Sequence, residues 1–231
     1  MAPKSDRVPT GIKGLDGIMG GGFEKNSVNL LRGGTGSGKT IFCLQFLYNG
    51  MEEYDEPGVY LSFSEQRNSL MMTAEGVGCR LDDNGDFAFI RHSPHEVERI
   101  LKEGGGTIRD VIDSLGAKRL VIDSLTAYSL FFDSDYRKNE GVLALMDIIK
   151  SWNITTVVTD EREVDLCSLE NGRLGFLSDS IIHMYYLRTD SVRVRGIEVV
   201  KMRHSPHADR IVPFRIEKKG ITVYPGTQLL V

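Results

Sequence analysis

The stretch Gly33–Thr40, which reads Gly-Gly-Thr-Gly-Ser-Gly-Lys-Thr, constrains the fold of this chain more than any other feature. It matches the pattern G-x-x-x-x-G-K-[ST] of a phosphate-binding P-loop. Residues 27–31 before it are typical of a buried strand, and residues 41–48 after it are typical of an amphipathic helix. Because strand, glycine loop and helix are the context in which this motif binds phosphate, a chance glycine-rich turn is the weaker interpretation.

The motif gives a separate role to each kind of residue in it. Its glycines let backbone N–H groups converge on phosphate oxygens, and the N-terminus of the following helix adds a partial positive charge. The Lys39 ammonium group is expected to reach the β- and γ-phosphates, and the Thr40 hydroxyl is expected to bind Mg²⁺. The predicted nucleotide-binding residues of this segment are Gly34, Thr35, Gly36, Ser37, Gly38, Lys39, Thr40 and Ile41.

The chain has 231 residues, of which 41% are hydrophobic and 26% charged, as in ordinary globular proteins. We see no linker and no internal repeat, so a single domain over residues 1–231 is expected, with residues 1–7 as a flexible tail. There is no run of about 18 apolar residues and no signal-peptide core, so neither a membrane nor secretion is predicted. Three widely separated cysteines favour a reduced, cytoplasmic protein.

Strands and helices alternate along most of the chain. After the strand at 27–31, strands are predicted at 59–63, 87–90, 119–123 and 154–159, and helices at 67–75, 94–103, 107–115 and 140–152. Residues 125–139 are expected to form a mobile loop, and the chain after residue 159 is mostly strand. This order indicates an α/β fold. We expect a P-loop NTPase core with a mainly parallel sheet flanked by helices, and antiparallel strands at the C-terminal end.

Three polar residues follow predicted strands at the sheet edge that carries the P-loop. Asp123 ends an apolar strand and is expected to hold Mg²⁺, although a helix-capping aspartate would give the same pattern. Glu65 is the candidate group that polarises the attacking water, the alternative being an acid favoured by a helix dipole. Thr159 is a candidate γ-phosphate sensor or an ordinary strand residue.

The charge of the chain is unevenly distributed. The net charge is −4, yet residues 188–219 hold nine Lys or Arg and only four Asp or Glu. A basic segment beside an acidic body indicates an electrostatic partner, which is either nucleic acid or nucleotide phosphate on another subunit, unless the charges only solvate a strand.

Four stretches together resemble the KaiC group of RecA-like ATPases. They are Thr10–Asp16 with Gly20–Gly22, the P-loop, residues 121–124 (Val-Ile-Asp-Ser) and residues 201–207 (Lys-Met-Arg-His-Ser-Pro-His). RadA- and DnaB-type relatives share the core but match less well at the C-terminal end. The resemblance covers about residues 8–226. It implies a RecA-like domain and a homo-oligomer, a hexameric ring, that binds ATP and Mg²⁺ between subunits.

The same resemblance gives roles to residues of the basic segment. In that family a Lys-x-Arg pair reaches the γ-phosphate held by the neighbouring subunit, which implies that Lys201 and Arg203 act in trans as catalytic groups. Arg195, Ile216 and Lys218 resemble positions that line the neighbour's nucleotide. Double-domain clock proteins carry a second P-loop that is absent here, so clock function is not implied.

One departure from the family concerns the catalytic acid. The family usually carries two adjacent glutamates after the second strand, whereas this chain has Ser64 and Glu65. The missing acid is the one that aligns with the catalytic glutamate of RecA relatives. Glu65 is therefore expected one residue out of register, on the other side of the strand, and ATP hydrolysis is expected to be slow.

Three functions are compatible with these features. The first is an oligomeric ATPase that acts as a regulatory or signalling switch with an unknown protein partner. The second is a nucleic-acid-dependent RecA or RadA-type ATPase, which is disfavoured because residues 125–140 and 160–175 carry more acids than bases, and acidic pore loops oppose phosphate binding. The third is a protein kinase acting on itself or a partner, for which Ser124, Thr126 and Ser129 are available acceptors.

Overall fold

The computed structural model describes residues 6–82, 85–102, 106–166, 174–189, 191–227 and 229, and every structural statement below refers to these. Most of the expected N-terminal tail, residues 1–5, lies outside this part. Arg7 does not belong to a tail, because Arg7–Val8 forms strand β1 and pairs with β2, Phe23–Glu24. None of the described helices is long and apolar enough to cross a membrane.

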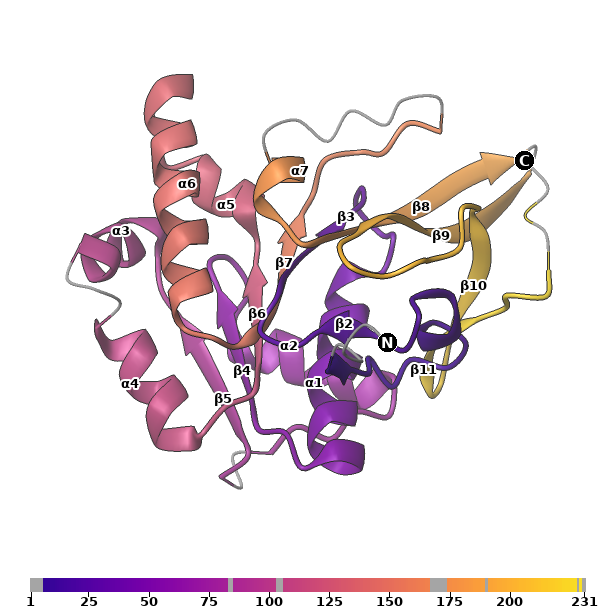
Figure 1. Ribbon diagram of the computed structural model, residues 1–231, viewed down its shortest axis with the longest axis horizontal. Helices are drawn as coiled ribbons and strands as arrows, with labels where there is room; N and C mark the ends of the chain where they lie inside the picture. Colours follow the sequence, from indigo (N-terminus) through magenta and orange to yellow (C-terminus); the bar gives the residue numbers. More distant parts are fainter. Residues whose placement is uncertain are drawn as a thin grey trace.

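A nine-stranded sheet with the order β11-β10-β9-β8-β3-β7-β6-β4-β5 forms the centre of the molecule (Figure 1). Its strands are β3 Val28–Arg32, β4 Gly58–Ser62, β5 Phe87–Arg91, β6 Arg119–Asp123, β7 Thr155–Asp160, β8 Ser180–Thr189, β9 Val192–Met202, β10 Val212–Glu217 and β11 Gly220–Val223. From β8 to β5 all pairs are parallel, and from β8 to β11 all are antiparallel. This confirms the predicted fold class.

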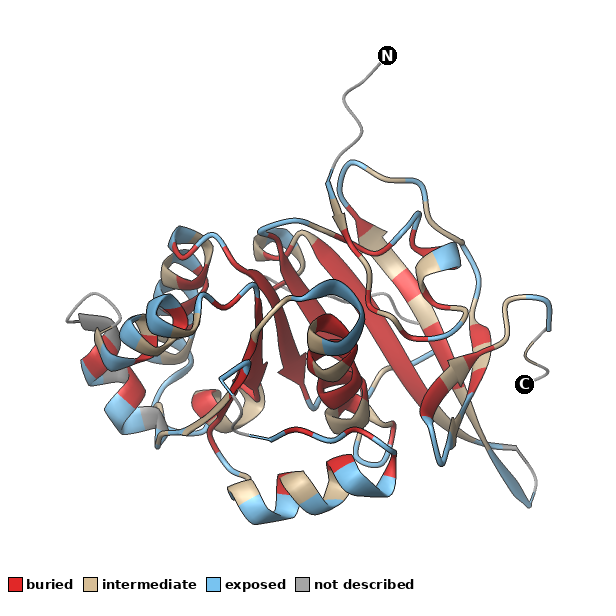
Figure 2. Ribbon diagram, turned by 90° about the horizontal axis from the view of Figure 1, so that it is seen from below, coloured by how far each residue is buried: buried red, intermediate tan, exposed pale blue. Residues whose placement is uncertain are grey.

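Helices cover both faces of the sheet (Figure 1). Their bounds are α1 Lys39–Tyr54, α2 Arg67–Gly76, α3 Pro94–Lys102, α4 Gly106–Leu115, α5 Leu125–Ser129, α6 Asp135–Ser151 and α7 Leu174–Leu177, with a 3₁₀ turn at Asp16–Ile18. The central strands are buried along their whole length (Figure 2), as expected for parallel strands covered on both sides. Alternate residues of each strand face two separate cores: Leu31 and Tyr60 pack with α1, whereas Leu30 and Leu61 pack with the α3–α6 side.

The predicted mobile loop at 125–139 is wrong over much of its length, because α5 and the first turn of α6 lie there. Each helix begins at a serine N-cap. The Ser124 hydroxyl accepts a hydrogen bond from the backbone N–H of Ala127, and the Ser134 hydroxyl accepts one from that of Arg137. A capping serine satisfies one of the free donors at a helix start, so it nucleates helices that hydrophobic periodicity alone does not reveal.

Candidate nucleotide-binding site

The P-loop connects β3 to α1 at the carboxyl edge of the sheet. Gly36 and Gly38 adopt φ angles of +79° and +107°, a left-handed conformation that favours glycine. Gly38 caps α1 without a capping side chain, so no side chain of the cap covers the N–H groups of the first turn. The loop therefore presents backbone donors at the positive end of a helix dipole, which is the arrangement that binds phosphate.

The polar side chains inside the loop also fit an anionic ligand. The ammonium of Lys39 donates to the carbonyl oxygens of Gly33 at 2.7 Å and Gly34 at 3.2 Å. Burial lowers the pKa of Lys39, while the nearby acids Glu161 and Asp123 oppose that shift. The Ser37 hydroxyl is buried and makes no hydrogen bond within the described part of the chain. A phosphate would supply the negative charge and the acceptors that this cradle lacks.

Asp123 ends β6 at the same edge, and hydrogen bonds fix both of its carboxylate oxygens. Tyr60 of β4 donates its phenol O–H to Oδ2, and Thr159 of β7 donates its hydroxyl to Oδ1, each at 2.5 Å. Both donors are fully buried, and burial followed by the charge of Asp123 raises the pKa of Tyr60. Asp123 is thus oriented by its two neighbouring strands, and Thr159 orients the acid rather than serving only to fill the strand.

The role of Tyr60 was not predicted from the sequence. Its signal was a tyrosine inside an otherwise apolar strand, since a buried phenol needs a hydrogen-bond partner.

The register argument made for Glu65 is wrong, because β4 ends at Ser62 and the chain then turns. The Ser62 hydroxyl accepts a hydrogen bond from the backbone N–H of Glu65 at 2.9 Å and donates to the Glu65 carbonyl oxygen at 3.2 Å. This turn leaves Ser64 exposed and Glu65 half-buried near Asp123. Burial, followed by the negative charge of Asp123, raises the pKa of the Glu65 carboxyl. Its Oε2 atom is buried and accepts no hydrogen bond from the described residues.

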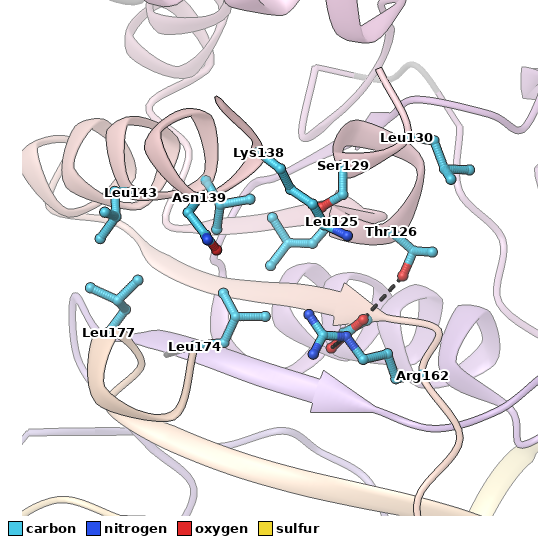
Figure 3. A pocket seen from close by; sticks show the side chains of 12 residues that line it. Leu125, Thr126, Ser129, Leu130, Lys138, Asn139, Leu143, Arg162, Leu174 and Leu177 are labelled. Carbon is cyan, nitrogen blue, oxygen red and sulfur yellow. Dashed lines mark hydrogen bonds and ion pairs between the residues drawn. The ribbon is translucent and has the colours of Figure 1, made fainter. Parts of the chain in front are cut away.

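Asp160, at the end of β7, forms a buried polar centre beside the P-loop. Its carboxylate accepts from Arg32 at 3.0 Å and from the Thr126 hydroxyl at 3.0 Å (Figure 3), and Arg162 lies 3.5 Å away. Its backbone carbonyl accepts the N–H of Gly33, the first residue of the P-loop, at 3.1 Å. The charge of Asp160 is therefore neutralised inside the subunit and is not part of an acidic loop surface.

The buried position of Asp160 weakens the argument that acidic loops at residues 125–140 and 160–175 oppose nucleic-acid binding. Of the other acids in these two segments, Asp135 and Glu140 lie on α6 rather than in a loop, and Glu170 lies outside the described residues together with Arg173 and Cys167.

Two of the residues expected at a neighbour's nucleotide lie beside this chain's own P-loop. The Arg195 guanidinium donates to the carbonyl oxygen of Gly36 at 3.2 Å and stacks on the Tyr186 ring at 4.2 Å. A β-carbon on Gly38 would lie 3.0 Å from the Cδ1 atom of Ile216. Arg195 and Ile216 thus lie beside the P-loop of their own subunit, and their predicted contact with a neighbour's nucleotide stays a prediction. Lys218 is exposed in the turn between β10 and β11.

Lys201 and Arg203 lie away from that P-loop. Lys201 lies near the end of β9, six steps along the strand from Arg195, or roughly 20 Å at about 3.4 Å per residue, and Arg203 follows directly after the strand. Lys201 pairs with Ile181 near the start of β8, and the N–H of Arg203 donates to the carbonyl oxygen of Asp179. The structure therefore gathers Lys39, Asp123 and Glu65 at one edge and leaves the Lys-x-Arg pair near the opposite one.

Together, the parallel sheet, the P-loop after β3 and the acid after β6 define a P-loop NTPase with a RecA-like fold. The family model "ATPase: KaiC" matches residues 8–228, and the chain belongs to the KaiC family of ATPases.

The relatives differ in how much of their length the chain matches. The UPF0273 protein MJ1359 of Methanocaldococcus jannaschii is 31% identical, with 96% of this chain and 98% of that protein covered. The circadian clock protein KaiC2 of Synechocystis is 31% identical over 97% of this chain, which spans only 41% of that protein. The crystal structure of the KaiC-like protein PH0186 from Pyrococcus horikoshii superposes with a TM-score of 0.84 at 32% identity, covering 96% of this chain and 100% of the other.

Proposed function

We propose that the protein is a slow, Mg²⁺-dependent ATPase that works as a homo-oligomer and switches shape with its bound nucleotide. The observation that carries this proposal is the separation of the two halves of the site. Lys39, Asp123 and Glu65 lie at one edge of the sheet, and the Lys-x-Arg pair lies near the other. A second subunit is the simplest way to bring the halves together around one ATP, and a hexameric ring is the arrangement we expect.

Within one subunit, the P-loop donors and Lys39 would hold the phosphates of ATP. Thr40, on the first turn of α1, and Asp123 would hold Mg²⁺, which neutralises charge on the β- and γ-phosphate oxygens. Tyr60 and Thr159 keep the Asp123 carboxylate in place for this purpose. Ile216 and Arg195 border the same cradle and contribute to nucleotide binding from β10 and β9, and Lys218 is the nearby exposed cation of the β10–β11 turn.

In the oligomer, Lys201 and Arg203 would meet the γ-phosphate of the ATP bound to the neighbouring subunit. A cation supplied in this way stabilises the charge of the transition state, and such groups accelerate phosphoryl transfer by about 10³–10⁵-fold.

Hydrolysis then depends on a single carboxylate, that of Glu65. Burial and the charge of Asp123 raise the pKa of Glu65, which strengthens it as a base, so the slow rate rests instead on the missing second acid, where this chain has Ser64. We therefore expect slow turnover. Ser64→Glu should raise the rate, because position 64 is exposed at the turn where the family resemblance implies a second acid. An unchanged or lower rate in Ser64→Glu would remove the explanation for slow turnover.

The kinase alternative receives no support from two of its three candidate acceptors. Ser124 is buried, caps α5 and donates to Glu161 at 3.1 Å, and the Thr126 hydroxyl donates to Asp160. Both hydroxyls are already committed to structural hydrogen bonds, so phosphorylation of either would break the start of α5. Labelled ATP followed by mass spectrometry tests this directly, and stoichiometric phosphoprotein would restore the kinase hypothesis.

The test of the proposal is the mass of the particle in solution with and without ATP–Mg²⁺. Light scattering coupled to gel filtration should show an oligomer that forms or grows with nucleotide. Lys39→Ala is the matched control, since it removes the phosphate contact and leaves the Lys-x-Arg pair intact. A wild-type protein that binds ATP yet stays a monomer in both conditions would overturn the shared-site proposal.

A further inference from the structure

The short helix α7 is held by one buried leucine and by polar contacts. It spans only the four residues Leu174–Leu177, far fewer than an isolated helix needs to be stable. Leu174 is buried in the core that α6 helps to form, and Leu177 packs against that core. Both also line a cavity of about 330 Å³, with Leu143 and Asn139 on the opposite wall (Figure 3). The side chain of Phe176 is 81% exposed. Leu174 is therefore the one buried residue among the four of α7, and the rest of this short helix depends mainly on polar contacts.

Two cations bind α7 and the turn after it through backbone carbonyls. The Lys201 ammonium donates to the carbonyl oxygens of Gly175 at 2.6 Å and Ser178 at 2.7 Å. The Arg203 guanidinium donates to the carbonyl oxygen of Phe176 at 3.0 Å and lies 3.6 Å from the Asp179 carboxylate. Cations at a helix C-terminus stabilise its unpaired carbonyls and its dipole. The Lys-x-Arg pair is thus the main polar anchor of α7 within the subunit.

We propose that Lys201 and Arg203 form a clasp that holds α7 in the free subunit and releases it when the pair binds a neighbour's nucleotide. This inference rests on the proposed function, because it needs ATP at a subunit interface. Lys201 uses two of its three N–H groups on these carbonyls, so turning the ammonium toward a phosphate of the neighbouring subunit would take it away from at least one of them. Phosphate oxygens are charged and form stronger hydrogen bonds with cations than neutral carbonyls do. Lys201 and Arg203 would therefore bind the neighbour's ATP in preference to the carbonyl oxygens of α7.

Release of α7 would also reach the site of the same subunit. Asp160 and Arg162 line the same cavity as Leu174 and Leu177. Asp160 is the residue whose carbonyl holds the N–H of Gly33 at the start of the P-loop. ATP bound to the neighbouring subunit would therefore loosen α7, which lies at the same cavity as Asp160. Through Asp160 this change would reach the P-loop, so that α7 couples two neighbouring ATP sites.

Hydrogen–deuterium exchange of the segment 174–179 tests the clasp without nucleotide. In α7 the Ser178 N–H donates to the Leu174 carbonyl oxygen at 3.1 Å and reports opening of the helix. Lys201→Met should speed its exchange by about tenfold, the effect of losing a hydrogen bond from a charged donor. Lys118→Met removes an exposed lysine elsewhere and should have no effect on this segment. Because Lys201 is part-buried, the more exposed Arg203→Met provides a second variant if Lys201→Met does not fold. Unchanged exchange in these variants would overturn the clasp.

The nucleotide arm uses the wild-type oligomer with a slowly hydrolysed ATP analogue and Mg²⁺. Exchange of 174–179 should rise on binding, and Lys39→Ala, which cannot hold the phosphates, should show no rise. An oligomer that binds the analogue while 174–179 stays as protected as before would overturn the release mechanism and leave the shared ATP site standing. Failure to bind the analogue at all would instead contradict the proposed function, and the nucleotide-free comparison would still decide whether the pair holds α7.

Discussion

The buried histidine beside the P-loop gives the protein an acid sensitivity of calculable size. His183 on β8 pairs with Arg32 of β3 and is 1% exposed. Burial, and then the positive charge of Arg32, lower its pKa from 6.5 to about 4, and Asp160 only partly opposes the shift. His183 therefore takes up a proton near pH 6.5 in the unfolded chain but only near pH 4 in the folded protein. Stability that is complete above pH 6.5 is lost as the pH falls through this window.

The pKa shift of His183 determines how much unfolding free energy is lost on acidification. A difference of about 2.5 units at 1.36 kcal/mol per unit corresponds to about 3 kcal/mol of unfolding free energy, of which about 2 kcal/mol falls between pH 6 and pH 4.5. The assay is urea unfolding followed by circular dichroism at pH 7.5, 6 and 4.5, with His183→Asn as the non-titrating control. Other acids titrate in both proteins, so the wild type should lose about 2 kcal/mol more than the variant over the lower step. Parallel pH curves for the two proteins would refute the reasoning.

Three further changes test the site and its support. Tyr60→Phe removes a donor from Asp123 and should raise the Mg²⁺ concentration for half-maximal ATP hydrolysis about tenfold, and an unchanged midpoint in a Mg²⁺ titration would count against it. Glu65→Gln should abolish hydrolysis but not ATP binding, and wild-type phosphate release should fall on acidification through the raised pKa of Glu65; an unaltered rate in the variant would sink the assignment. Arg119→Ala removes the fully buried partner of Glu56, whose side chain is 25% exposed and 2.7 Å away, and should cost about 1.5–3 kcal/mol in urea unfolding.

The fold and the P-loop could be predicted because their signals are local. The glycine pattern, the strand before it and the helix after it occupy one continuous segment, and alternation of strands with helices indicates a parallel sheet whatever the strand order. Acids at strand ends share an edge for the same reason, so the neighbourhood of Asp123 and Glu65 did not require knowledge of which strands pair. The assignment of catalytic and binding roles to these residues stays a prediction.

What could not be predicted depends on which strands are neighbours. Tyr60 reaches Asp123 because β4 lies beside β6, and Arg32 meets Asp160 because β3 lies beside β7. Nothing in the sequence order fixes these pairings. The period-two argument for Glu65 failed because β4 ends at Ser62, before either of the two positions compared. The anchoring of α7 was equally hidden, since its acceptors are backbone carbonyls, which every sequence contains.

The central claim is that one ATP site is built from two subunits, and mixing inactive variants tests it most directly. Lys39→Ala keeps the Lys-x-Arg pair but lacks a working P-loop, and Arg203→Ala has the opposite defect. In a randomly mixed equimolar oligomer about a quarter of the interfaces would combine the intact halves, so phosphate release should recover to about a quarter of the wild-type rate. A mixture that forms mixed oligomers, shown by native mass spectrometry, yet stays as inactive as each variant alone would contradict the account.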